Sequence, residues 1–148
     1  SPYAIRGFPG YASLLIEVPY SILSSAGGRF TLTEVREIIK KHMPSGHYPV
    51  IRFIGPQVEI NNIKSMGNNL NINWTAPDTI IDKYRVYYST SGEGNWILGT
   101  EVEKDVLETD LELIEGTYYI YITYAIKKDN ILFEQMKSKI FKIQHVIN

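Results

Sequence analysis

The sequence predicts an α+β chain in which a small βαβ-like piece, residues 1–55, precedes an antiparallel β-sandwich, residues 56–148. Two observations predict this class. Apolar residues recur at helical spacing in residues 32–42, whereas beyond residue 58 they mostly alternate with polar residues, as in strands with one buried face. Turn residues divide the second region into about seven short strands, which is the pattern of two packed antiparallel sheets.

The N-terminal piece is expected to contain two parallel strands. Residues 11–18 and 47–54 are compact apolar runs, and the segment between them has a helical pattern. A crossover helix places the strands that it joins parallel to each other. Two strands and one helix bury too little surface to stand alone. Since the chain also opens with Ser1 rather than Met, we expect it to be a fragment of a longer protein that enters an α/β domain midway.

The helix between these strands has a recognisable start and end. Thr31 and Glu34 have the spacing of a capping box, in which each side chain accepts a hydrogen bond from the backbone N–H of the other residue. The segment Pro44-Ser45-Gly46 ends the helix. One face of the helix is expected to pack inward, and it comprises Leu32, Val35, Ile38, Ile39 and His42.

Two strands of the second region carry the expected core anchors. Alternation with a period of two directs every second side chain of residues 70–74 and 82–88 to the same side. The anchors are Trp74, Tyr84, Val86 and Tyr88. Trp74 is the strongest of them because its indole ring offers a large apolar area for burial. The final strand is expected over residues 131–143, with a bend near Glu134.

Three features of residues 58–147 together are similar to a known family. They are Trp74 on the second strand, the segment Tyr84-Arg85-Val86-Tyr87-Tyr88 on the third, and the corner Leu113-Ile114-Glu115-Gly116-Thr117-Tyr118-Tyr119. This region resembles a fibronectin type III domain, whose corner reads Leu-x-Pro-Gly-Thr-x-Tyr, although Glu115 stands where that family prefers Pro. The resemblance implies a sandwich that serves as a spacer or a binding surface, and such a fold names no ligand by itself.

Two registers are open for the strand at residues 118–126. The corner motif makes Tyr119 the buried tyrosine, whereas apolar alternation turns inward the row Tyr118, Ile120, Ile122 and Tyr124. The two registers differ by one residue and therefore bury opposite faces of the strand. We favour alternation, because burying one large apolar side chain contributes roughly 1.5–3 kcal/mol.

The outward tyrosines form the candidate interaction surface. Tyr87, Tyr119 and Tyr121 are expected to make a cross-strand ladder on the face away from the core, and Trp96 lies next to a Gly-rich turn. Such a surface can dock another protein or stack against sugar rings. The alternative is that cross-strand aromatic pairs only stabilise the sheet.

No catalytic or cofactor-binding motif is found in the sequence. The chain has 0 cysteines, and it lacks both a nucleophile elbow and the Lys of a phosphate loop. His42 and His47 flank the helix end without a third ligand, so no metal is predicted, and His145 is uninformative. The net charge of −1 predicts no nucleic-acid binding. No segment reaches the roughly 18 consecutive apolar residues that membrane insertion requires.

A second resemblance covers residues 11–54. The helix at residues 32–41, followed by Met43-Pro44-Ser45-Gly46-His47-Tyr48, is similar to the closing segment of some phage tail and baseplate proteins. We therefore predict a non-catalytic structural module of a larger assembly, such as a phage-type tail or baseplate, that binds other subunits or further copies of itself. The alternative is a carbohydrate-binding accessory module of a secreted bacterial enzyme or adhesin, with a glycan as partner. These functions imply a virion, an extracellular or a cell-surface location.

Overall fold

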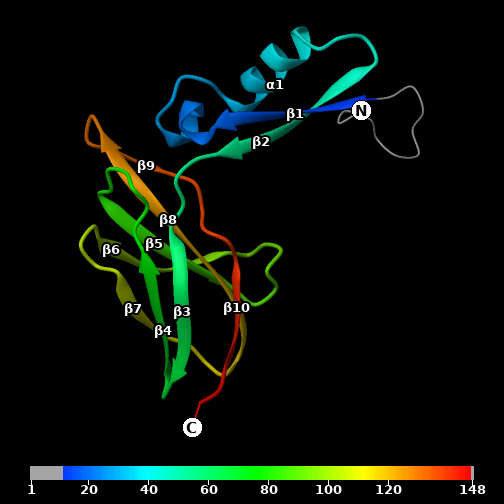
Figure 1. Cartoon of the computed structure of the whole chain (residues 1–148). Helices are drawn as coiled ribbons and strands as arrows, with labels where there is room; N and C mark the ends of the chain where they lie inside the picture. The colour runs from blue at the N-terminus through cyan, green and yellow to red at the C-terminus, as the bar shows by residue number, and fades with distance from the viewer. Residues whose placement is uncertain (1–11, 148) are drawn as a thin grey trace. The chain divides into compact units, whose positions relative to one another are not determined.

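The computed structural model describes residues 12–147 and divides into two compact units, residues 1–55 and residues 56–148, each of which is described by itself (Figure 1). Unit 1 contains β1 (Ala12–Pro19), η1 (Tyr20–Ile22), η2 (Ser24–Ala26), α1 (Leu32–Lys41) and β2 (His47–Ile54). Unit 2 contains β3 (Glu59–Met66), β4 (Asn69–Thr75), β5 (Lys83–Ser89), β6 (Ile97–Glu103), β7 (Glu108–Glu112), β8 (Gly116–Lys128), β9 (Ile131–Glu134) and β10 (Phe141–His145).

Unit 1 has the parallel strand pair that the crossover pattern predicts. β1 and β2 pair in register from Ala12 opposite His47 to Pro19 opposite Ile54. α1 begins with the predicted capping box: Thr31 Oγ1 accepts a hydrogen bond from the Glu34 backbone N–H, and Glu34 Oε1 accepts one from the Thr31 backbone N–H, both at 3.1 Å. Local sequence chemistry therefore fixes where this helix begins.

The apolar face of α1 is buried only in part, so the prediction for this face was wrong in part. Val35 is buried and Ile39 is half-buried, and both belong to the small core of unit 1. Leu32 and Ile38 are 39% and 44% exposed, and His42 is exposed as well. A sheet of two strands is narrower than the apolar stripe of the helix, so it covers only the side chains directly above it.

The connection from β1 to α1 belongs to this small core. Ala26 is fully buried, and the backbone N–H of Gly28 donates to the Leu23 carbonyl at 2.8 Å. A Cβ atom at Gly28 would lie 2.2 Å from the carbonyl carbon of Ile22, so only glycine permits this close approach of two backbone segments. This connection is therefore packed and contributes to the core of unit 1.

Unit 2 is a sandwich of two antiparallel sheets, as the alternating pattern predicts (Figure 1). One sheet has the strand order β3-β4-β7. The other has the order β10-β8-β5-β6, and β9 also pairs with β8. The inner faces of the two sheets enclose one apolar core, which comprises Val58, Ile63, Leu70, Ile72, Trp74, Tyr84, Val86, Leu111, Tyr118, Ile120, Ile122 and Tyr124.

Three of the four expected core anchors lie inside this core. The rings of Trp74 and Tyr84 meet edge to face with their centroids 5.4 Å apart, and Val86 is fully buried beside them. Tyr88 is half-buried at the margin of the core, where its ring contacts that of Tyr118 at a centroid distance of 6.0 Å. Contacts between rings from both sheets hold the two layers together.

β8 follows the register that apolar alternation favours. Tyr118 is buried and its hydroxyl donates to the carbonyl of Ile114 at 2.7 Å, whereas Tyr119 faces outward and is half-buried. The corner motif, which assigned the buried position to Tyr119, was therefore wrong by one residue. Burial of Ile120 and Ile122 on the inner face outweighs the motif match.

The final strand is interrupted, and the predicted bend lies at the end of β9. β9 stops at Glu134, and β10 starts only at Phe141. Between them the chain still follows β8, because the Ser138 backbone N–H donates to the Ile122 carbonyl at 2.8 Å while Ser138 Oγ accepts from the Ile122 N–H at 2.9 Å. The backbone N–H and C=O groups of Ile122 on β8 therefore have hydrogen-bond partners even though residues 135–140 do not form a regular strand.

Candidate functional site

The candidate surface lies on the outer face of the β5–β8 pair. Tyr87 and Tyr121 stand opposite each other in the antiparallel register, while their neighbours Val86 and Ile122 point into the core. The two tyrosine rings stack with their centroids 4.9 Å apart and their planes 24° from parallel. The strand register therefore places both tyrosines on the same outward face, where each is half-buried.

Two further side chains contact the ring of Tyr121. Trp96, which immediately precedes β6, meets it edge to face at a centroid distance of 4.6 Å. The ammonium group of Lys137 lies 5.2 Å from the centroid of the same ring, within the range of a cation–π interaction. Tyr121 is thus the centre of an aromatic cluster, which we define as Tyr87, Trp96 and Tyr121.

An ion-pair network borders the aromatic cluster. Glu134 Oε2 accepts hydrogen bonds from the Tyr87 hydroxyl at 2.6 Å and from Arg85 Nη1 at 3.2 Å. Arg85 Nε donates to Glu101 Oε2 at 2.8 Å. Lys83 Nζ lies 3.2 Å from carboxylate oxygens of both Glu101 and Glu103. Strands β5, β6 and β9 therefore share one chain of alternating charges on this face.

These contacts shift the ionisation of the groups involved. The hydrogen bond from Arg85 is the main cause that lowers the pKa of Glu101. Burial, followed by the hydrogen bond to the Glu134 carboxylate, raises the pKa of Tyr87 far above its usual value. Both shifts favour the forms that make the network, a charged carboxylate and a neutral phenol. The network consequently holds its side chains in one arrangement near neutral pH.

Tyr119 lies on the outer face of the same sheet but contacts different groups. A Cβ atom at Gly92 would lie 2.8 Å from Tyr119 Cδ1, so the β5–β6 turn packs closely against this ring. Lys142 Nζ lies 5.7 Å from the ring centroid. Ser89, which is buried, fixes that turn by accepting from the backbone N–H groups of Ser91 and Gly92. The expected ladder therefore has two parts, the aromatic cluster and Tyr119.

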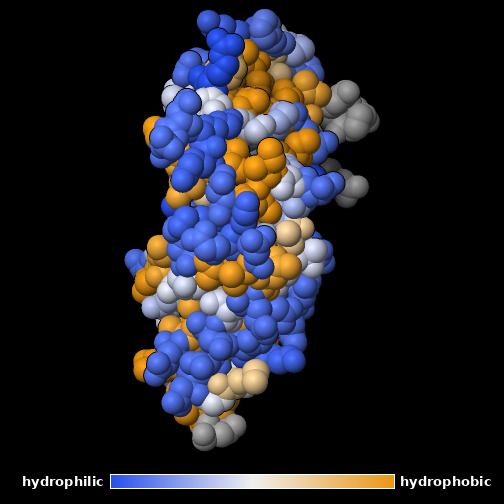
Figure 2. All heavy atoms as spheres, turned by 90° about the vertical axis from the view of Figure 1, so that its left-hand side faces the viewer, coloured by the Kyte–Doolittle hydropathy of each residue, from blue (hydrophilic) through white to orange (hydrophobic). Residues whose placement is uncertain are grey.

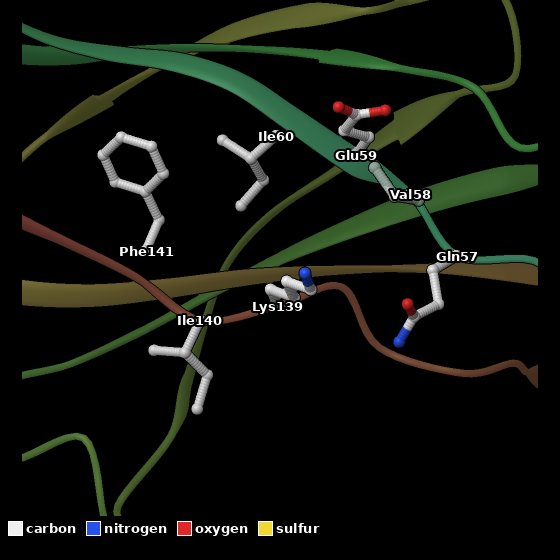
Figure 3. A pocket seen from close by; sticks show the side chains of 7 residues that line it. All are labelled: Gln57, Val58, Glu59, Ile60, Lys139, Ile140 and Phe141. Carbon is white, nitrogen blue, oxygen red and sulfur yellow. The ribbon is translucent and has the colours of Figure 1, made fainter. Parts of the chain in front are cut away.

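A groove opens between β3 and the start of β10, on another side of unit 2 (Figure 3). It has a volume of about 670 Å³ and is lined in part by Val58, Ile60 and Phe141. Figure 3 shows the side chains of Ile60 and Phe141 pointing toward each other, while Ile140 points away from them. The groove contains no cluster of titratable side chains, since Glu59 and Lys139 are the ionisable residues among those that line it.

The buried His145 was not recognised from the sequence. Its Nδ1 lies 2.7 Å from Ser65 Oγ, and its Nε2 lies 3.2 Å from the carbonyl oxygen of Asn68 and 3.0 Å from that of Leu113. Because carbonyl oxygens only accept hydrogen bonds, Nε2 carries a proton. Alternation from Phe141 to His145 could have indicated its inward position. The side chain links the end of β10 to two loops and has a structural role.

The other two histidines are exposed, and His47 Nδ1 lies 3.2 Å from the Ser45 carbonyl oxygen. Within residues 12–147, no three acidic or histidine side chains converge in a way that could hold a metal ion. In the same part of the chain, no helix has the length and apolar character needed to cross a bilayer.

Comparison with known proteins defines the fold class. No family model matches the chain, and no curated protein matches it in sequence. Among solved structures, unit 2 is similar to two human fibronectin type III domains studied in solution. One has a TM-score of 0.50 at 16% identity and covers 64% of this chain and 82% of that domain. The other has a TM-score of 0.50 at 9% identity and covers 61% and 73%.

A bacterial enzyme contains a similar module. The β-1,2-glucanase of Parabacteroides distasonis matches with a TM-score of 0.52 at 18% identity, over 62% of this chain. The match spans only 13% of the glucanase, so the fold is one part of a much larger chain there. Unit 2 thus has a fibronectin type III-like fold, a fold that occurs as a module of larger proteins.

Proposed function

We propose that this chain is a non-catalytic interaction module of a larger assembly, and that unit 2 binds another protein through the aromatic cluster. The observation that carries the proposal is the composition of the outer β5–β8 face, where Tyr87 and Trp96 contact Tyr121, and Arg85 shares the Glu134 carboxylate with Tyr87. These residue types are enriched at the centres of protein interfaces and contribute most of the binding energy there. A fibronectin type III-like sandwich provides a rigid support for such a face.

The cluster is already ordered before any partner binds. Tyr87 is held by its hydrogen bond to Glu134 and by stacking on Tyr121, and Trp96 is held against the same ring. Binding through side chains that are fixed in advance loses little conformational entropy. The half-buried rings still have surface to offer to a partner. This arrangement favours docking of a preformed protein surface.

The ion pairs on this face support a non-catalytic role. Glu101 and Glu134 both accept hydrogen bonds from Arg85, and Lys83 pairs with Glu101. General acid–base catalysis uses groups whose pKa values lie near the working pH. Here the pairing lowers the pKa of Glu101 and raises that of Lys83, which moves both away from neutrality. Such a network suits positioning and recognition better than proton transfer.

A phage-type tail or baseplate is the assembly that we favour. The basis is the order of elements in unit 1, where α1 is followed by Pro44-Ser45-Gly46 and then by β2, the arrangement of the resemblance noted in the sequence. In such an assembly the partners are other protein subunits, and the location is the virion.

A carbohydrate-binding accessory module is the second candidate, and the glucanase match favours it. The glucanase is named for its action on a glucan, and in this second candidate function unit 2 retains a glycan for an enzyme to which it is attached. Sugar stacking needs an open aromatic face. The ring of Tyr121 is engaged by Tyr87, Trp96 and Lys137, which leaves Trp96 as the better platform.

Binding measurements on Trp96→Ala test the proposal. The proteins encoded beside this gene are purified and titrated against the whole chain by calorimetry. We expect one of them to bind, and Trp96→Ala to weaken that binding about tenfold or more, as for a hot-spot residue. Ile80→Ala is the matched control, because Ile80 is 80% exposed and lies outside the cluster. Thermal unfolding verifies that both variants remain folded.

A glycan array separates the two candidates. Binding of the chain to glucans that is lost in Trp96→Ala, with no binding to neighbouring gene products, favours the accessory module. Equal protein binding by the wild type and Trp96→Ala contradicts the aromatic cluster as the docking surface.

A further inference from the structure

The outer face of the β1–β2 sheet in unit 1 is an apolar surface that no element of residues 12–55 covers. Residues at odd positions of β1 and even positions of β2 point to this side, opposite to the small core. We define the outer sheet face by these positions, which are Ser13, Leu15, Glu17, Pro19, Tyr48, Val50, Arg52 and Ile54. Its four large apolar side chains are exposed by 56% at Leu15, 41% at Tyr48, 45% at Val50 and 38% at Ile54.

Exposed apolar residues alone do not mark an interface. Figure 2 shows one side of the molecule, on which apolar residues reach the surface between hydrophilic ones. The outer sheet face differs from scattered exposed apolar residues because it belongs to a pair of parallel strands. Parallel sheets occur almost only where both faces are covered. α1 and the β1–α1 connection supply residues to the core on one side, and within unit 1 no described helix lies on the other.

The charges on this face form one balanced pair. Glu17 stands opposite Arg52 in the strand register, and Glu17 Oε2 lies 3.7 Å from Arg52 Nε. The two side chains remain 49% and 65% exposed, so both are accessible to a partner. They are the charged residues of the face, which is therefore neutral overall. A complementary surface must offer apolar residues together with one acid and one base.

We infer that the partner of the outer sheet face is a second copy of this chain. A two-fold axis parallel to the strands and midway between β1 and β2 brings β1 of one copy over β2 of the other. Each registered pair within one sheet then becomes a pair between sheets: Leu15 packs on Val50 of the second copy, and Glu17 meets its Arg52. Such an interface is self-complementary by symmetry.

The charge pattern selects this axis. An axis across the strands would place β1 on β1 and would put Glu17 against an uncharged residue of β1 or a second Glu17, never against Arg52. The axis along the strands produces two Glu17–Arg52 pairs and no like-charge contact. Eight positions per copy are fewer than the roughly 20–30 residues on each side of a standard interface. The dimer is therefore weak and depends on concentration, unless the rest of an assembly holds two copies together.

Sedimentation velocity on the whole chain over a wide concentration range tests the inference. The wild type shifts from monomer to dimer as concentration rises. Glu17→Arg and Arg52→Glu each place like charges across the interface, and each weakens dimerisation about tenfold or more. An equimolar mixture of the two variants restores the dimer, because the arginine introduced in one variant then meets the glutamate introduced in the other. Each chain of that mixture still has a like-charge pair within its own sheet.

The mixture distinguishes self-association from loss of folding. If the single variants only disturbed the strand pair within a chain, mixing them would restore nothing. The double variant Glu17→Arg with Arg52→Glu keeps opposite charges both within and between copies, and it dimerises like the wild type. Leu15→Lys abolishes the dimer, whereas Glu93→Arg on the β5–β6 turn leaves it unchanged. Circular dichroism shows whether each variant is folded.

Two results overturn the inference. One is a wild-type chain that stays monomeric at every concentration. The other is a dimer that is insensitive to Glu17→Arg, Arg52→Glu and Leu15→Lys. The inference is independent of what the aromatic cluster binds: loss of dimerisation in Leu15→Lys with binding through Trp96 intact, or the reverse, separates the two surfaces.

Discussion

The two units of this chain differ in how completely they bury their apolar faces. In unit 2, each sheet covers the inner face of the other, and one cluster contains twelve buried apolar residues. Among the described residues of unit 1, the corresponding cluster contains four, and one face of the sheet and part of α1 are exposed. Within the described residues, the chain therefore joins a module that encloses its own core to a piece that leaves one sheet face open. Apolar content alone does not reveal this difference, because both regions are rich in apolar residues; the small number of elements predicted for residues 1–55 indicates it.

The largest expected effect follows from removing the strongest anchor of unit 2. Trp74→Ala deletes a ring that is 2% exposed, and we expect it to lower the free energy of unfolding of this unit by about 3–5 kcal/mol. Denaturant titration followed by circular dichroism measures the loss. Ile80→Ala is the control and should change stability by no more than about 0.5 kcal/mol. If the two units unfold independently, hydrogen exchange in α1 and β2 is the same in Trp74→Ala and in the wild type. Faster exchange in the variant would show that unit 1 depends on unit 2 for its stability.

Gly28→Ala tests the small core of unit 1 in the same way. The new methyl group meets the Ile22 backbone, which cannot move aside as a flexible side chain can, so we expect unit 1 to lose about 1–3 kcal/mol. Hydrogen exchange of β1 and α1 measures the effect. Gly94→Ala is the matched control, because nothing lies within 4 Å of a Cβ atom there. Equal exchange in the two variants would mean that the β1–α1 connection is not packed as described.

The Tyr118 hydroxyl provides a smaller test of how unit 2 closes. Tyr118→Phe removes the hydrogen bond to the Ile114 carbonyl, with an expected loss of about 0.5–1.5 kcal/mol. Tyr119→Phe is the control, since Tyr119 points outward. The shift of the unfolding midpoint in denaturant measures both. A larger loss for Tyr119→Phe than for Tyr118→Phe would restore the register that the corner motif suggested.

The smallest effect is expected from acid titration of the ion-pair network. The pKa of Glu101 is lowered in the folded protein, so its contribution to stability is present above its unfolded pKa of 4.5 and is lost as pH falls through the folded value. Glu101→Gln should therefore reduce stability slightly at pH 7 and flatten its decline on acidification. The side chain is 31% exposed, so solvent screens much of the interaction. Parallel declines in the wild type and Glu101→Gln would exclude this contribution.

Much of the fold could be predicted from local patterns. The capping box located the start of α1, and alternation with a period of two placed Tyr118, Ile120 and Ile122 inward. The family motif was less reliable than alternation at the corner, where Glu115 stands in place of the family's proline and Tyr118 rather than Tyr119 is buried. Patterns of this kind act over a few residues, so sequence reasoning can use them directly.

Features that depend on distant residues could not be predicted in the same way. The partners of Glu134 are Arg85 and Tyr87, which lie 49 and 47 positions away in the sequence. Cross-strand register brings them together, and no local motif encodes it. The exposure of Ile38 likewise depends on the width of the sheet beneath α1 rather than on the spacing of the helix itself.

The interruption between β9 and β10 affects how readily other chains can pair with this edge of the sheet. An uninterrupted outermost strand presents a row of free N–H and C=O groups on which other chains can build amyloid-like ribbons. Here that border consists of pieces of four and five residues, separated by a stretch that includes the exposed lysines Lys137 and Lys139. Such a border is a poor template for growth of fibrils. Strand addition at this border of the sandwich is therefore disfavoured, even at high protein concentration.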